Sequence, residues 1–292
     1  MDLNKVVKFL DGFFNTKQSG PDLPFSRLIP NIYNSGGIRL SNFVYPDFTK
    51  NFNGLMFKNA DQVDDFFSTV FLSQDAIDRI ANNDSRKLLI THHPMDDNTS
   101  EKGFLPLTEA YLDKIIKYKI SIYSLHNPLD QNKNISSSKS IANALSLNNL
   151  EYFMDNEGVV GELPEWLSTE ELLIKAKSIF GISDIKSVEK SKKNKRIAVV
   201  AGGGSEPSTL EIIRNLKPDA YITGEYISRI KNNFAEKERG KFNELLPSLD
   251  FSLIGASHYA TESLVLKNEL KKLLDDELGI NLKFLDQEDS WY

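Results

Sequence analysis

Apolar residues recur along the chain at two spacings, one typical of amphipathic helices and the other of buried strands. Over residues 2–14 they return at offsets of three and four, which predicts a helix with Asp2 as its N-cap. Residues 60–82 show a similar spacing and predict one or two further helices. Residues 15–60 have no clean period, so only a short strand around residues 54–58 is predicted there.

From residue 88 onward, short apolar runs alternate with helical patterns. The runs predict buried strands at 88–90, 120–125, 197–200, 220–222 and 251–256. The intervening patterns predict helices at 108–118, 138–147, 169–180, 208–216 and 262–277. Ser208 and Glu211 fit a capping box at the start of the fourth helix. Strands that alternate with helices form parallel sheets covered on both faces, so the predicted fold is α/β: three-layer α/β/α, with largely parallel sheets in two similar lobes.

The two lobes are expected at approximately residues 1–135 and 186–292, joined by a helical segment at 136–185. A lysine-rich stretch, SVEKSKKNKR, lies between residues 186 and 196, just before a predicted strand. Runs of charge are usually solvated loops, so this stretch marks a lobe boundary more readily than a functional basic patch.

Composition narrows the classes of protein that this chain can represent. Of its 292 residues, 40% are hydrophobic and 26% are charged, as in ordinary globular proteins. The absence of cysteine excludes disulfides and thiolate chemistry, so any metal must be held by nitrogen and oxygen. A net charge of −6 argues against nucleic acid as a partner, because phosphate backbones are bound mainly by Lys and Arg. Charges within the first 14 residues, and the lack of a long uncharged apolar stretch, predict a cytoplasmic protein without membrane association.

All four histidines come directly after predicted strands. They occur in LLITHHP (His92 and His93), ISIYSLHNPLD (His126) and FSLIGASHYATE (His258). In open α/β sheets, ligand sites form beyond the carboxyl ends of the strands. We therefore expect the imidazoles to lie along one sheet edge.

His258 and Glu262 are four residues apart where a strand gives way to a helix, so both side chains fall on one helical face. This spacing suits two ligands of one metal ion, although a surface His–Glu pair would show it as well.

His92 and His93 are adjacent, and Pro94 favours an extended backbone at His93. Successive side chains of an extended chain point in different directions, so two metal ions sharing a carboxylate could each take one imidazole. In the alternative interpretation, one histidine caps the strand and the other is exposed.

His126 and Asp130 flank Pro128, which argues against a regular helix through this segment. Asp130 is a candidate metal ligand from a loop. His126 could be a ligand, but an orienting group or a general base near metal-bound water is favoured. A loop histidine without chemistry is the remaining alternative.

Two further motifs follow predicted strands. Gly202, Gly203 and Gly204 could present backbone N–H groups to an anion, or could simply form a tight strand-to-helix turn. Glu225 in YITGEY could line the cleft and transfer protons, or could favour the start of a helix.

These motifs, in this order, resemble those of the Nif-three-like family, whose members are often labelled GTP cyclohydrolase I type 2 homologues. The resemblance runs from about residue 88 to the C-terminal helix, whereas the first sixty residues fit the family poorly. The motifs are THHP, HNPLD in place of the family's usual HTNLD, GVVGELPEWLSTEELLIKAKSIFG, RIAVVAGGGSE, DAYITGE and SHYATES.

The resemblance implies a single Nif-three-like module over residues 1–292 that binds two divalent metal ions. By resemblance, His92 and His258 serve one metal, His93 and Asp130 serve the other, and Glu262 bridges both. Such nitrogen and oxygen ligands suit zinc, manganese, iron, cobalt or nickel. The family also implies a toroidal homohexamer.

Two classes of function follow from these expectations. The first is a metal-dependent hydrolase acting on a nucleotide-like or other small phosphate or heterocyclic substrate, with His126 or Glu225 moving protons. The second is a non-catalytic metal-binding regulatory or interaction protein. Open coordination positions at the metals would favour the first class, and closed ligand shells would favour the second. A ring that clasps nucleic acid through a local basic rim is a third hypothesis, against which the net acidity argues.

Overall fold

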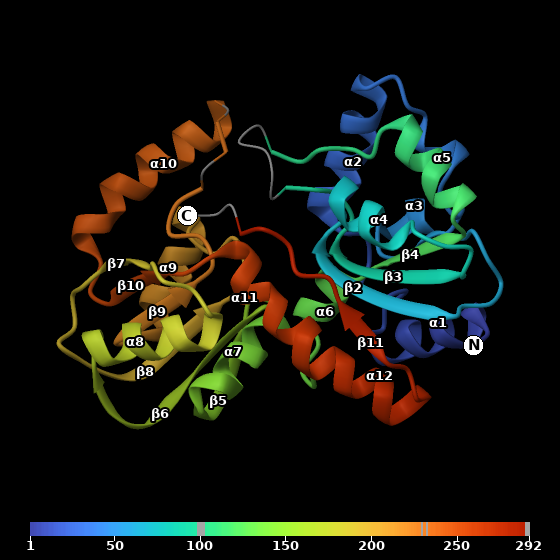
Figure 1. Ribbon diagram of the computed structural model, residues 1–292. Coiled ribbons are helices and arrows are strands. Elements are labelled where there is room, and N and C mark those ends of the chain that lie inside the picture. The colour runs from blue at the N-terminus through green and yellow to red at the C-terminus, as the bar shows by residue number, and fades with distance from the viewer. Residues whose placement is uncertain (98–102, 229, 232, 290–292) are drawn as a thin grey trace. The chain divides into compact units, whose positions relative to one another are not determined.

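The computed structural model describes residues 1–97, 103–228, 230–231 and 233–289. The chain divides into two compact units. The first comprises Met1–Ser100, Phe104–Leu129 and Leu266–Glu288, and the second is built mainly from Asp130–Val265. Each unit contains one β-sheet (Figure 1).

The sheet of the first unit has five strands in the order β1-β4-β3-β2-β11. Its strands are β1 (Gly54–Phe57), β2 (Asp65–Phe71), β3 (Lys87–His93), β4 (Ile120–Ser124) and β11 (Leu282–Phe284). Strands β4, β3, β2 and β11 pair in parallel, and β1 joins the edge antiparallel to β4.

Helices cover both faces of this sheet. They are α1 (Leu3–Phe13), α2 (Leu23–Ser35), α3 (Phe48–Asn51), α4 (Gln74–Ile80), α5 (Glu109–Lys117) and α12 (Lys271–Leu278), with short 3-10 and π segments at Leu40–Asn42 and Leu266–Leu270. Apolar residues of α2, α4 and α5 pack on one face against Leu89 and Ile122. On the other side, α1 contacts β1, and the π segment contacts β2.

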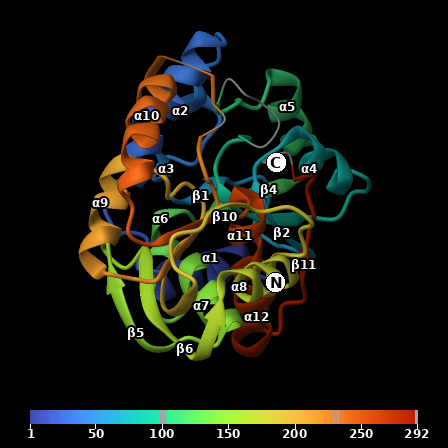
Figure 2. The same cartoon turned by 90° about the vertical axis from the view of Figure 1, so that its left-hand side faces the viewer.

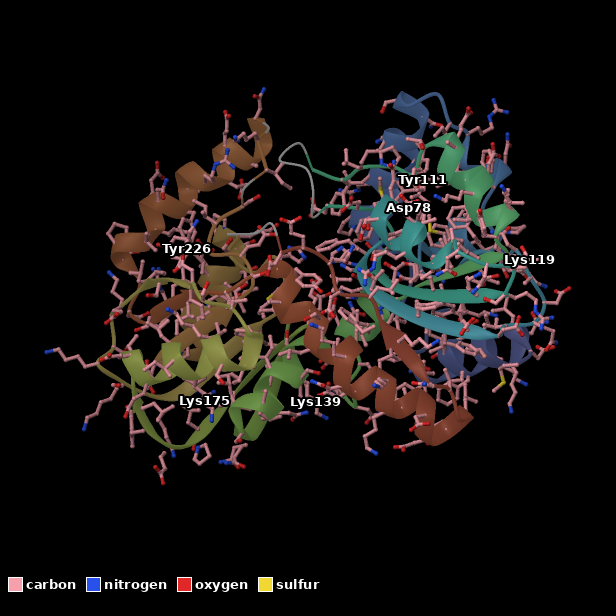
Figure 3. All side chains as sticks on the ribbon, in the orientation of Figure 1. Asp78, Tyr111, Lys119, Lys139, Lys175 and Tyr226 are labelled. Atoms are coloured by element: carbon pink, nitrogen blue, oxygen red, sulfur yellow. The ribbon has the colours of Figure 1, made fainter. Side chains whose placement is uncertain are left out.

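Polar contacts also join the helices of the first unit. Tyr111 of α5 donates a hydrogen bond of 2.7 Å to Asp78 of α4, and the two side chains lie together in Figure 3. Lys114, one turn further along α5, pairs with the same carboxylate at 2.5 Å. These exposed contacts add little stability by themselves, but they fix the relative position of α4 and α5.

The sheet of the second unit has six strands in the order β5-β6-β8-β9-β10-β7. Its strands are β5 (Asn148–Phe153), β6 (Gly158–Ser168), β7 (Lys186–Val188), β8 (Lys193–Val200), β9 (Ala220–Thr223) and β10 (Ser252–Gly255). Strands β8, β9 and β10 are parallel, whereas β5, β6 and β7 pair antiparallel with their neighbours.

Alternate residues of the central strands face different helices. Val199 and Ile222 pack with α7 and α8, whereas Ala198 and Tyr221 pack with α9 and α10 (Figures 1 and 2). The helices are α7 (Ser137–Leu145), α8 (Thr169–Phe180), α9 (Pro207–Leu216), α10 (Asn233–Leu245) and α11 (His258–Val265), with a 3-10 turn at Leu246–Ser248. The short helix α6 (Asn127–Asp130) lies where the chain passes from the first unit to the second.

The expected α/β class, with helices on both faces of the sheets, is confirmed. Among the described residues, no helix combines the length and apolar character needed to cross a bilayer.

Several local predictions are wrong for identifiable reasons. The first half of the helical pattern at 60–82 is strand β2, because a strand buried on both faces carries apolar residues without a period of two. The helical connector expected at 136–185 contains the β5–β6 hairpin as well as α7 and α8. Helix α9 begins at Pro207 with Glu206 as its cap, so Ser208 does not form the expected capping box.

Candidate metal centre

Three histidines of the first unit meet at one edge of its sheet. Strands β3 and β4 run parallel with Thr91 opposite Ser124, so the residues that follow these positions emerge side by side. Ring centroids are 4.7 Å apart for His92 and His93, 4.9 Å for His92 and His126, and 4.8 Å for His93 and His126. One nitrogen from each ring lies within 4.8 Å of the others, so the three imidazoles could hold a metal ion.

Aromatic packing fixes these rings in a dry environment. Phe71 of β2 stacks on His93 with a centroid separation of 4.8 Å, and Phe25 of α2 meets His93 and His126 edge-on. His92 is fully buried, and His93 is 3% exposed. Rings held in this way need little reorganisation to bind a ligand.

Two of the three imidazoles have a defined hydrogen-bond acceptor at Nδ1. In His92 this nitrogen lies 2.9 Å from the backbone oxygen of Leu125, and in His126 it lies 2.6 Å from Oδ2 of Asp22. Metal-bound histidines almost always donate their second ring N–H to a carbonyl or carboxylate in this way. In this arrangement Nε2 is the nitrogen that would bind the metal.

Asp22 is placed by the start of α2. It is the N-cap of this helix, accepting a hydrogen bond of 3.1 Å from the backbone N–H of Phe25. Burial alone raises the pKa of Asp22, but the neighbouring His126 and the bond from Phe25 outweigh this effect, so the pKa lies below its usual value. Asp22 is therefore a buried anion next to His126.

A second group of ligand residues lies in the second unit, at the start of α11. Nε2 of His258 is 3.1 Å from Oε1 of Glu262, which confirms that the two side chains share a helical face. Nδ1 of His258 is 2.6 Å from Oε1 of Glu225, which follows β9. Glu225 thus supports His258 as Asp22 supports His126, by occupying its Nδ1.

Electrostatics within this second group favour a positive charge. Burial of the His258 ring lowers its pKa, but the carboxylates of Glu262 and Glu225 outweigh burial and raise the pKa well above the usual value. Two nearly buried carboxylates around one imidazole form an acidic pocket of the kind that a divalent cation would neutralise.

The glycine turn after β8 makes room for this group. Gly202 has a φ of +66°, and a Cβ atom there would lie 2.2 Å from Oε1 of Glu262. The N–H groups of Gly202 and Gly204 donate to the hydroxyls of Thr261 and Thr223, both at 3.1 Å. Because two of the three glycine amides are used internally, the structure favours the tight-turn interpretation over an anion site.

The structure therefore brings together part of the predicted site within each unit. His92, His93 and His126 form one group, and His258, Glu262 and Glu225 form another. Asp130 is half-buried at the end of α6, and its role as a ligand stays a prediction. The prediction against a helix at Pro128 is wrong, because this proline lies within the first turn of α6, where proline is tolerated.

Asp22, Phe25 and Asn53 were not predicted to belong to the site. Asn53 accepts a hydrogen bond of 2.9 Å from the backbone N–H of His126 through Oδ1. The sequence does indicate the helix that carries Asp22 and Phe25, because Asp22 followed by Pro24 is a typical helix start. No local pattern links Asn53 to a histidine 73 residues away.

A sequence profile of the Duf34/NIF3 family, described as NGG1p interacting factor 3, matches residues 48–290 and so includes all four histidines. The chain belongs to the Duf34/NIF3 family. Among its NIF3 relatives, the GTP cyclohydrolase 1 type 2 homolog of Pyrococcus horikoshii is 28% identical over 295 residues, which cover 98% of each chain. The protein of the same description from Pyrococcus abyssi is 29% identical over 254 residues, covering 85% of this chain and 93% of the relative.

Solved structures agree with the NIF3 assignment at the level of the fold. Protein TTHA1606 from Thermus thermophilus matches with a TM-score of 0.68 and 18% identity over 99% of each chain. Reduced HcgD from Methanocaldococcus jannaschii matches with a TM-score of 0.66 and 20% identity over 98% of each chain.

Proposed function

We propose that this NIF3-family chain is a metal-dependent hydrolase that acts on a nucleotide-like or other small phosphate or heterocyclic substrate. The observation that carries the proposal is the buried group of His92, His93 and His126, in which two rings have their Nδ1 atoms held by a carbonyl or a carboxylate. With Nδ1 held in this way, Nε2 of His92 and of His126 is the nitrogen left for a metal ion or for a proton.

The residues fit divalent metal ions. Imidazole nitrogens and carboxylate oxygens are hard to intermediate donors that suit zinc, manganese, iron, cobalt or nickel. We assign His92, His93, His258, Asp130 and Glu262 as the ligands of two ions, in the pairing that the sequence resemblance implies. When bound, such ions lower the pKa of water and polarise the bond to be cleaved.

The other residues of the two groups would orient ligands and move protons. Asp22 fixes the ring and the tautomer of His126, which is the requirement for a general base at Nε2. Glu225 does the same for His258, so its first role is positioning, with proton transfer as a further proposed role. Phe25 and Phe71 keep bulk water away from the imidazoles.

A hydrolysis screen tests this proposal. The purified chain is assayed against nucleotides, phosphoesters and cyclic amides, after chelation and after addition of each candidate metal. We expect turnover that depends on metal and falls by at least about 100-fold in His93→Ala and in His92→Ala, as for loss of direct metal ligands. Circular dichroism checks that both variants fold.

The screen also separates the competing function. Stoichiometric metal binding without turnover of any substrate would support a regulatory or interaction protein instead. Turnover that is unchanged in His93→Ala would contradict the assignment of this site. We also propose a homohexamer in the cytoplasm, for which light scattering of the purified chain measures the number of copies.

A further inference from the structure

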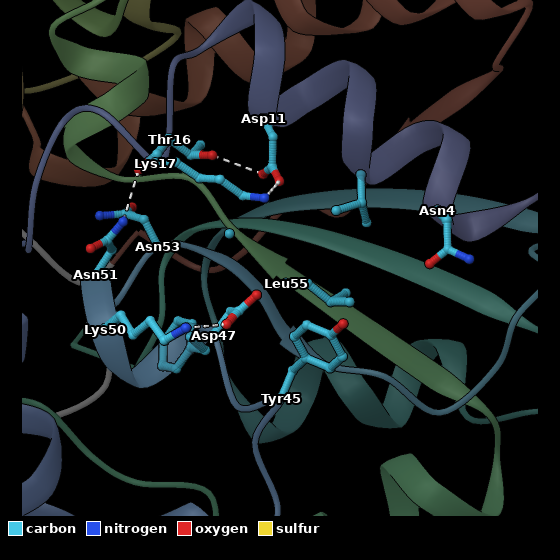
Figure 4. A pocket seen from close by; sticks show the side chains of 13 residues that line it. Asn4, Asp11, Thr16, Lys17, Tyr45, Asp47, Lys50, Asn51, Asn53 and Leu55 are labelled. Carbon is cyan, nitrogen blue, oxygen red and sulfur yellow. Dashed lines mark hydrogen bonds and ion pairs between the residues drawn. The ribbon is translucent and has the colours of Figure 1, made fainter.

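A cavity of about 470 Å³ opens in the first unit, bounded by α1, the segment that follows it, α3 and β1 (Figure 4). Its volume lies in the range of small-molecule sites. None of the histidines lines it, and the cavity shares only Asn53 with the residues described at the candidate metal centre.

The charged side chains of the cavity neutralise one another. Lys17 lies 3.9 Å from Asp11, and Lys50 lies 2.6 Å from Asp47. Figure 4 shows the two pairs on different walls. Since these four are the charged residues of the lining, its formal charge is zero. Each ammonium is already paired with a carboxylate, which cancels most of its attraction for a phosphate group. The charges of the lining therefore favour an uncharged ligand.

Some polar groups of the cavity are held in place by hydrogen bonds, and others remain available to a ligand. Oδ1 of Asp11 accepts from Thr16 at 2.8 Å and from Tyr123 at 2.7 Å, which fixes the carboxylate. The Asn4 amide and the Tyr45 hydroxyl form no hydrogen bond with any residue in the described part of the chain. Donors and acceptors are thus spread around the rim.

Part of the lining forms an apolar wall. Leu55 and Val7 line the cavity together with the ring of Tyr45, which is 37% exposed. Gly54 also lines it and has a φ of +91°, a conformation that disfavours any side chain at this point. A planar ring could stack on the ring of Tyr45 and contact these side chains while its edge meets the polar groups.

We propose that this cavity binds an uncharged heterocycle of the size of a nucleobase or nucleoside. The apolar wall takes the ring, and the Oδ2 atoms of Asp11 and Asp47 accept from its N–H groups, since the hydrogen bonds within the described residues go to Oδ1 of each. The amide of Asn4 and the hydroxyl of Tyr45 serve its remaining donors and acceptors. The site requires no metal.

Calorimetric titration of the full chain in chelator tests the proposal, with adenosine, guanosine, cytidine and uridine as probes. At least one probe is expected to bind with a dissociation constant below about 1 mM. Asn4→Trp, which places a ring in the cavity, is expected to weaken this binding by at least about tenfold. Lys5→Trp adds the same side chain at the next, exposed position of α1 outside the lining and should leave binding unchanged.

Tyr45→Ala provides a second variant that removes the ring without adding bulk, and it is also expected to weaken binding. Three results would overturn the proposal: no binding of any probe up to about 10 mM, equal binding by Asn4→Trp and the unmodified chain, or loss of binding in His93→Ala alone.

The 5′-monophosphates of the same nucleosides are the control for ligand charge. If they bind more than about tenfold better than the nucleosides, the inference of an uncharged ligand is wrong.

Discussion

The carboxylate of Asp22 lies 2.6 Å from Nδ1 of His126, with Asp22 fully buried and the histidine side chain 17% exposed. A buried carboxylate is costly unless it is paired and hydrogen-bonded. Asp22 meets both requirements, because it also accepts from the N–H of Phe25. The same side chain therefore starts helix α2 and orients an imidazole of the candidate metal centre.

Asp22→Asn is expected to lower the metal-dependent rate of hydrolysis by at least about 100-fold, because an amide cannot hold the His126 tautomer that leaves Nε2 able to act as a general base. Asparagine is as good an N-cap as aspartate, so α2 should persist. The initial rate at saturating metal, with the substrate that the hydrolysis screen identifies, measures this effect. Asp22→Ala also removes the cap and should lower the free energy of unfolding by a further ~1 kcal/mol.

Asp2→Asn is the matched control for this prediction. Asp2 caps α1 through the N–H of Lys5 at 3.1 Å, but it is exposed and forms no contact with a histidine among the described residues. The Asp2→Asn variant should hydrolyse the substrate at the rate of the unmodified chain. Equal rates in Asp22→Asn and Asp2→Asn would show that Asp22 serves only helix α2.

Gly202→Ala is expected to damage the second ligand group through steric contact. The added Cβ atom would lie 2.2 Å from Oε1 of Glu262, and the φ of +66° disfavours alanine. Gly181 has a φ of +67°, and a Cβ atom added there would have no neighbour within 4 Å, so Gly181→Ala carries the backbone strain alone. We expect that control to cost about 1–2 kcal/mol of unfolding free energy without affecting metal binding.

The difference between the two alanine variants isolates the displacement of Glu262. Denaturant unfolding and metal titration are measured on both. Gly202→Ala should bind metal more weakly than Gly181→Ala, and it should be the less stable of the two. Identical metal affinities would mean that Glu262 can move without loss of binding.

Tyr33 provides a prediction about stability at high pH. Burial raises the pKa of its phenol to about 12, whereas an exposed tyrosine titrates near 10. Below pH 10 the phenol is protonated in both the folded and the unfolded chain, so its titration does not change the free energy of unfolding. Between pH 10 and 12 the unfolded chain loses the proton before the folded chain does. The free energy of unfolding therefore falls over this range, by up to roughly 3 kcal/mol.

Tyr33→Phe should therefore show a shallower loss of stability between pH 10 and 12 than the unmodified chain. At neutral pH this variant should be less stable by about 1 kcal/mol, because the Tyr33 hydroxyl accepts a hydrogen bond of 3.2 Å from the N–H of Leu107. Urea unfolding at a series of pH values measures both effects. Parallel curves for the two proteins would contradict the raised pKa.

Elements whose burial is one-sided could be predicted from the sequence. Helix α1 has a clear apolar stripe behind Asp2, and the structure confirms both the helix and its cap. Strand β2 could not be separated from a helix, because Phe66, Phe67, Val70 and Phe71 imitate helical spacing when both faces of a strand are covered. Helix α2 was missed because Pro30 interrupts its pattern.

The same distinction applies to the candidate site. His258 and Glu262 could be paired from sequence because a helix brings residues four apart onto one face. Asp22 and His126 are separated by 104 residues, and their contact depends on how α2 packs against the sheet. Supporting residues of this kind carry no local spacing, so they appear only with the tertiary structure.

Glu262→Gln should separate a metal ligand from a residue that only positions one. The amide would keep the shape of the buried side chain but lose the negative charge that a bridging ligand supplies. At least one metal position should therefore be empty in a folded protein.

Glu225→Gln is the comparison, because Glu225 contacts His258 at Nδ1 rather than at Nε2. Loss of a supporting carboxylate should weaken affinity about 10–100-fold, yet both positions should fill at saturating metal. Elemental analysis after equilibrium dialysis measures the occupancy, and full occupancy of both positions in Glu262→Gln would contradict its assignment as the bridging ligand.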